Sequence, residues 1–204
     1  FNAIFFTYAL LLSSLYGIST NSVGLYLLGL AGGSLIGPWA LGGLFDSLGR
    51  KPLIVSTYLA SAFFVGVTGY LLTLGVLDPI AHTIAWSVIL LLASIGANGA
   101  YLSTGELFPQ EMRATAFGFL FATGTLAGIA VPMLFALLLQ TGSQAQLFYG
   151  YLVAAALLAI AALAEIFLGI ATERRTLESI ARPLSLQSIG AAAPHPKKPR
   201  RKAA

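Results

Sequence analysis

Three charged side chains stand close together in residues 42–53, GGLFDSLGRKPL, between two long uncharged stretches. They are Asp46, Arg50 and Lys51. A second acid and base, Glu106 and Arg113, begin and end the segment 106–113. Charges are costly inside a membrane but tolerated at its edge, where ion pairs between helix ends stabilise one conformation over another. These residue types and spacings predict a reversible network of salt bridges.

A few further polar side chains lie inside apolar stretches. Asn98 and Tyr101 are three residues apart and share one face of a helix, while Asn2 and Tyr8 lie in the first stretch. Such groups either line a substrate site or hydrogen-bond neighbouring helices. Glu165 lies ~9 Å inside the last stretch, where an acid can relay protons or reach back to the membrane edge.

The sequence contains no recognisable constellation of catalytic or metal-binding residues. It has no cysteine, and its two histidines, His82 and His195, are isolated, one in a loop and one in the tail. Neither a nucleophile motif nor a phosphate-binding loop is present. We therefore predict that the chain is not an enzyme and uses no metal and no cofactor.

The composition is that of a membrane protein. Hydrophobic residues make up 57% and charged residues 9%, with a mean hydropathy of +0.86, whereas soluble domains contain about 25% charged residues. Apolar stretches of about 20 residues cross a ~30 Å hydrocarbon core as helices, which satisfy their own backbone. We predict an all-α membrane protein with a six-helix bundle over residues 1–171. The expected spans are 1–18, 23–45, 52–75, 79–105, 114–139 and 147–171.

Two local patterns predict how spans begin and pack. Asp78 followed by Pro79 is typical of a helix N-cap with proline in the first turn. Glycine at four-residue spacing lets helix backbones approach closely. That spacing occurs at Gly29, Gly33 and Gly37 and again at Gly124 and Gly128.

The positive charges predict the orientation in the membrane. All eleven Lys and Arg residues follow the second, fourth or sixth span, so the positive-inside rule places these loops and the C-terminus in the cytoplasm. The opposite loops hold only Asp78 and His82 as candidate charges. We predict a multi-pass protein of the plasma (inner) membrane. Orientation alone is the simplest role for Arg50 and Lys51.

The sequence changes character after residue 171. Residues 172–184 have the charge and leucine pattern of a short cytoplasmic surface helix, and residues 185–204 lack the apolar content to fold. The basic run 197–202 has the composition of a nuclear signal or nucleic-acid arm. Beside six spans, it fits better as a disordered basic cytoplasmic tail near anionic lipid headgroups. The expected partner is the lipid bilayer and not nucleic acid.

Three segments together resemble signatures of the major facilitator superfamily and its sugar-porter group, over residues 1 to about 184. The first resembles the superfamily's loop motif at Gly42, Asp46, Gly49, Arg50 and Lys51. The second resembles a sugar-porter motif at Glu106, Phe108, Pro109 and Arg113. The third is similar to the motif after the last helix, at Thr172, Glu173, Arg174, Leu177, Glu178 and Ile180.

The resemblance implies six helices that form the C-terminal half of a twelve-helix secondary transporter working by alternating access. It implies a missing N-terminal six-helix half, a small-molecule substrate and protons as the coupling ion. It also implies that the charged network, including Glu173 and Arg174, closes the cytoplasmic side. The sugar porters' Pro-Ile-Pro-Trp block is replaced by NGAY at residues 98–101, so a carboxylate or organic ion is as compatible as a sugar.

Two other functions fit the same composition. A non-transporting sensor or scaffold on the same fold differs from a porter only in lacking uptake. A channel would need rings of charged side chains along a pore, and the spans show no such ring.

The predicted orientation can be tested with single cysteines, because the chain has none of its own. A cysteine at His195 is expected to react with an impermeant thiol reagent only from the cytoplasmic side, and one at Ser143 only from the opposite side, since all Lys and Arg segregate to one side. Gly49 is expected on the same cytoplasmic side as His195. Reaction at position 143 from the cytoplasm alone would contradict this topology.

Overall fold

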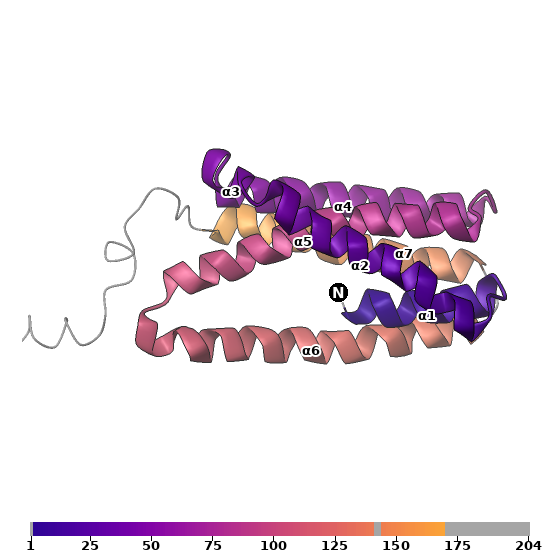
Figure 1. The fold of residues 1–204 in the computed structure, drawn as a ribbon. Coiled ribbons are helices and arrows are strands. Elements are labelled where there is room, and N and C mark those ends of the chain that lie inside the picture. The colour runs from indigo at the N-terminus through magenta and orange to yellow at the C-terminus, as the bar shows by residue number, and fades with distance from the viewer. Residues whose placement is uncertain (1, 141–143, 170–204) are drawn as a thin grey trace, which may run out of the picture.

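The structure, a computed structural model, describes residues 2–140 and 144–169, and these residues form helices and no strand (Figure 1). The predicted surface helix at 172–184 and the basic tail at 185–204 lie outside the described residues. The helices are α1 (Asn2–Leu15), α2 (Thr20–Leu41), α3 (Leu44–Ser47), α4 (Arg50–Thr73), α5 (Pro79–Leu107), α6 (Gln110–Gln140) and α7 (Gln144–Leu168).

Five of the six apolar stretches form helices that are long and apolar enough to cross a membrane: α2, α4, α5, α6 and α7. The first stretch is expected over residues 1–18, and its described helix α1 has 14 residues. That length is about 21 Å, less than a ~30 Å hydrocarbon core. Figure 1 accordingly shows α1 beside only part of the length of α6.

The bundle has two ends with different chemistry. We call the end where α4 begins and α5 and α7 finish the Arg50 end, which lies to the left in Figure 1. The opposite end, where α5 and α7 begin, is the His82 end. The main contacts join α4 to α7, α2 to α5 and α4 to α5, whereas α6 packs chiefly on α1. The buried core includes Leu12, Leu30 and Leu90.

Two loops show why specific residues are needed at helix ends. The Asp78 carboxylate accepts a hydrogen bond of 2.7 Å from the backbone N–H of Ala81, and Pro79 occupies the first turn of α5, which confirms the predicted cap. Gly49, the residue before α4, has a φ of 91°. Side chains other than glycine are strained in that region, so the turn between α3 and α4 depends on this glycine.

Glycines on α2 place its backbone directly against α5. A Cβ atom at Gly33 would overlap the carbonyl oxygen of Ser87, and one at Gly37 would overlap that of Leu91. The predicted close approach of this span is therefore confirmed. At Gly124 of α6 no other described part of the chain comes within 4 Å of an added Cβ, so a close approach there stays a prediction.

The α2–α5 contact predicts opposite effects for two neighbouring substitutions. Gly33→Ala is expected to lower the free energy of unfolding by about 1–3 kcal/mol, because the added methyl overpacks the contact. Gly32→Ala meets nothing within 4 Å and is expected to raise stability by ~0.5–1 kcal/mol, since alanine favours the helix. Denaturant unfolding of the detergent-solubilised chain, followed by circular dichroism, measures both. Equal stability of the two variants would contradict the contact.

Candidate functional site: the charged end and the buried histidine cluster

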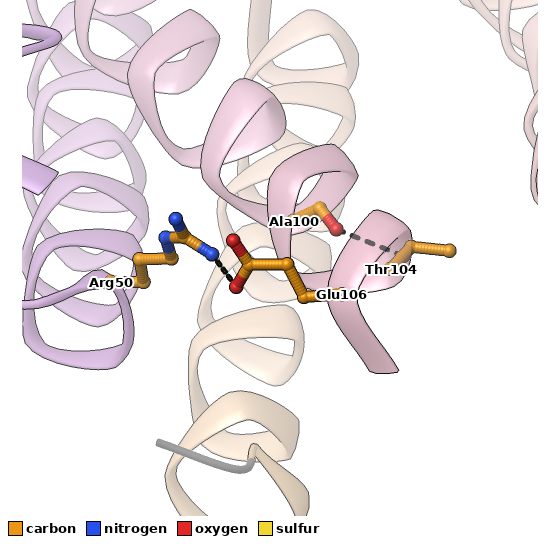
Figure 2. A network of polar contacts seen from close by, with 4 residues as sticks. All are labelled: Arg50, Ala100, Thr104 and Glu106. Carbon is orange, nitrogen blue, oxygen red and sulfur yellow. Dashed lines mark hydrogen bonds and ion pairs between the residues drawn. The ribbon is translucent and has the colours of Figure 1, made fainter. Parts of the chain in front are cut away.

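An ion pair joins α4 to α5 at the Arg50 end. The Arg50 guanidinium pairs with the Glu106 carboxylate, and the two side chains are 16% and 25% exposed (Figure 2). Arg50 is the first residue of α4, and Glu106 lies in the last turn of α5. Figure 2 shows Glu106 pointing toward Arg50, whereas Thr104 bonds its own helix through Ala100. The structure thus brings together an acid and a base from the two loops expected to interact.

Lys51 contacts the end of another helix, α7. Its ammonium donates a hydrogen bond of 2.9 Å to the carbonyl oxygen of Gly169, just after α7. Cations at a helix C-terminus satisfy free carbonyls and oppose the negative end of the helix dipole. Arg50 and Lys51 are adjacent, yet one binds α5 and the other α7, so both do more than signal orientation.

The remaining members of the expected charged network are only partly placed. In the described part of the chain, the Nε atom of Arg113, in the first turn of α6, is buried without a hydrogen-bond partner. Asp46 lies on the short helix α3, but its side chain is outside what the structure describes, as are Glu173 and Arg174. Gly42 lies directly after α2, where a Cβ would crowd the carbonyl oxygen of Pro38.

Glu165 lies on α7, one turn before Gly169. Its carboxylate bends toward Gly169, the residue whose carbonyl Lys51 binds, and it lies within the electrostatic reach of that ammonium. The side chain is only partly buried. A role of Glu165 in proton coupling stays a prediction.

The predicted substrate residues fall into two separate places. The Tyr8 side chain is buried, and its hydroxyl lies 2.7 Å from the Thr83 hydroxyl near the start of α5. Asn98 is exposed and donates a hydrogen bond of 2.8 Å to the carbonyl oxygen of Ser94. Fifteen residues separate positions 83 and 98 along α5, or about 22 Å. Tyr8 and Asn98 therefore do not face one small site in this conformation.

Tyr101 stays with Asn98 on the same part of α5. Its ring stacks on the ring of Phe121 in α6, with centroids 5.2 Å apart and an interplanar angle of 14°. The side chain of Asn2 is outside what the structure describes. Asn98 and Tyr101 are thus the two predicted substrate residues that the structure places together.

A buried cluster around His82 was not expected. His82 is fully buried in the first turns of α5, with Nδ1 3.0 Å from the Tyr16 hydroxyl and Nε2 2.8 Å from the Tyr151 hydroxyl. Trp86 also donates from Nε1 to His82 Nε2, at 3.1 Å. The prediction of an isolated histidine is wrong because His82 lies inside the predicted helix, where Tyr16 and Tyr151 from other parts of the chain bond both ring nitrogens. The four-residue spacing of His82, Trp86 and Leu90 on one buried helix face is the signal that could have revealed it.

The bundle also contains an apolar cavity of about 690 Å³ between α4, α5, α6 and α7. Its lining includes Trp86, Phe135, Leu138 and Leu158 and has no charged side chain. Such walls offer little to a polar metabolite. No group of metal-binding side chains occurs among residues 2–140 and 144–169.

Comparison with known proteins agrees with this architecture. Residues 2–184 match the family described as Sugar (and other) transporter. The chain is also similar to the niacin transporter NiaP of Acinetobacter baylyi, with 30% identity over 142 residues. That match covers 67% of this chain and 30% of the relative, so the chain spans about three tenths of the protein it resembles. No solved structure matches.

The family match covers most of the chain and includes both loops that carry the Arg50–Glu106 pair. The described helices, without strands and apolar over membrane-spanning lengths, are those of an all-α fragment of the major facilitator fold. The chain therefore belongs to the sugar (and other) transporter family of the major facilitator superfamily.

Proposed function

We propose that this chain forms the C-terminal six-helix half of a proton-coupled symporter that moves a small polar metabolite by alternating access. The observation that carries the proposal is the Arg50–Glu106 pair, which ties the start of α4 to the end of α5. In this proposal the Arg50 end faces the cytoplasm of a cell with the protein in its plasma (inner) membrane. The substrate is a sugar, a carboxylate or an organic ion, and the similar niacin transporter favours a carboxylate.

The ion pair acts as a gate that is closed in this conformation. A contact made in one state shifts the equilibrium between states by its differential energy. A partly exposed pair is worth about 1 kcal/mol, which corresponds to about a fivefold shift in population. The Lys51–Gly169 contact adds α7 to the same closed end. Asp46, Arg113, Glu173 and Arg174 complete this gate in the proposal.

Asn98 and Tyr101 are the proposed contacts with the substrate. Asn98 lies nine residues before the end of α5 at Leu107, or about 14 Å, which is near the middle of a ~30 Å hydrocarbon core. Substrate sites of such carriers lie near the midplane between the two halves. The exposed Asn98 side chain is available to the N-terminal half, which would cover it.

Charge exchange tests the gate. In the chain co-expressed with its preceding six helices, Arg50→Glu and Glu106→Arg are each expected to reduce uptake at least tenfold, because each places like charges opposite one another. The double exchange is expected to recover at least a third of the uptake, since it restores the pair. Initial uptake rates at equal surface expression measure this, with Glu111→Arg, an exposed site on α6, as the matched control. Unchanged uptake in both single variants would refute the gate.

A second prediction concerns the proposed contacts with the substrate. Asn98→Ala is expected to weaken substrate affinity about two- to twelvefold, the effect of one lost hydrogen bond, whereas Glu165→Gln leaves affinity unchanged. Competition of unlabelled substrate against labelled uptake gives both values.

The 204-residue chain alone is expected to show no uptake, because its half-formed site faces lipid. Gradient-driven uptake by the isolated chain would contradict the two-half proposal, and a folded complex of both halves without uptake would favour a sensor.

A further inference from the structure

The His82 cluster joins three helices at the end of the bundle opposite the ion pair. Tyr16, directly after α1, bonds His82 of α5, and His82 bonds Tyr151 of α7. Tyr8 adds a second link from α1 to α5 through Thr83. The side chains of Tyr8, His82 and Tyr151 are at most 2% exposed.

The hydrogen bonds favour one position for the proton of His82. The Trp86 indole can only donate, and its Nε1 lies 3.1 Å from His82 Nε2 and 3.2 Å from the Tyr151 hydroxyl. The Tyr151 hydroxyl lies 2.8 Å from Nε2 and, among the described residues, has an acceptor for its own proton only when Nε2 accepts. The proton of a neutral imidazole then lies on Nδ1, which donates to the Tyr16 hydroxyl. The Tyr16 hydroxyl in turn donates to the carbonyl oxygen of Leu77 at 3.1 Å. Each donor in this chain therefore meets an acceptor when the imidazole is neutral.

The same arrangement disfavours an imidazolium. A proton on Nε2 would have to be accepted by the Tyr151 hydroxyl, which also accepts from the Trp86 N–H, and the Tyr151 proton would lose Nε2 as its acceptor. The first turns of α5 also carry the positive end of the helix dipole, which disfavours a cation. The titratable groups around the imidazole come from four helices. They are Tyr8 and Tyr16 at α1, Tyr26 on α2, which lies near Tyr8, Tyr151 on α7, and Asp78 at the start of α5, the helix that carries His82.

The acid among these groups forms no ion pair with His82 in the described structure. The Asp78 carboxylate instead accepts from the N–H of Ala81 at the start of α5. The nearby parts of α4 and α6 contribute Gly69 and Phe135 against Tyr151, which carry no charge. In the described part of the chain, a protonated His82 would thus lack a neutralising partner in this conformation.

We propose that His82 is a proton-binding site, and that its protonation releases α1 from α5 and α7 at this end of the bundle. The coupling role of this site rests on the proposed function, in which the His82 end faces the outside and opens toward it. The released imidazole is solvated and holds the proton, while Tyr16 and Tyr151 lose their shared partner. Outside acidity would then favour the outward-open state.

The size of the effect follows from linkage. A histidine side chain in water binds a proton with a pKa of about 6.5. Since the closed cluster binds no proton and the open state does, acid shifts the population toward the open state. The ratio of open to closed molecules is expected to rise about tenfold between pH 7.5 and pH 5.5.

The test uses the 204-residue chain in lipid nanodiscs, with His195→Gln so that His82 is its single histidine. Nitrogen NMR of ¹⁵N-histidine-labelled protein is expected to show a neutral ring protonated on Nδ1 at pH 7.5 and a growing doubly protonated fraction at pH 5.5. Spin labels at Ser14→Cys and Gln146→Cys, both exposed, report the separation of α1 from α7. The ratio of open to closed molecules is expected to rise about tenfold over the same range.

His82→Gln, which offers a donor and an acceptor but does not titrate, is expected to abolish the pH response. Should that variant misfold, Tyr16→Phe supplies the second test, because it weakens the closed cluster and is expected to move the transition to higher pH. An Nε2-protonated ring at pH 7.5, an unchanged label distance, or an equal pH response without His82 would each overturn the proposal. These readouts require no transport, so their failure is distinguishable from loss of uptake in the two-half protein.

Discussion

The backbone of α2 lies against the backbone of α5 at Gly33 and Gly37, and this is the closest approach of two helices that the described glycines of the bundle allow. In hydrocarbon, helices gain little from burying apolar surface, so association depends on close packing and on interhelical hydrogen bonds. Helix α5 is suited to this role on a second side as well, because Gly96 and Gly99 admit Tyr58 and Ile54 of α4. It therefore serves as the central helix and carries both polar clusters.

The two ends of α5 hold their neighbours by different means. At the Arg50 end the contacts are ionic, with Arg50 bound to Glu106 and Lys51 bound to the end of α7. At the His82 end they join neutral groups, and an imidazole is the shared partner. Salt weakens the first kind of contact where water reaches it, and protons act on the second. A single rigid helix thus separates two contacts that respond to different conditions.

Much of this arrangement was predictable from local sequence. Apolar length predicted the spanning helices, Asp78 with Pro79 predicted the start of α5, and glycine spacing predicted the α2–α5 contact. What local sequence does not predict is which helix lies beside which. Gly124 has the same spacing but no described neighbour, and Tyr8 meets the start of α5 rather than Asn98 because of how α1 is placed. Hydropathy gives no information about such pairing.

The pairing of α1 with α6 has a consequence for synthesis. The 14 described residues of α1 find their main partner in a helix that begins at Gln110, after three other long helices have been made. At about 5–20 residues per second, roughly 5–20 s pass between the two. During that interval α1 lacks its main described partner, so the order in which helices leave the ribosome differs from the order in which they pack.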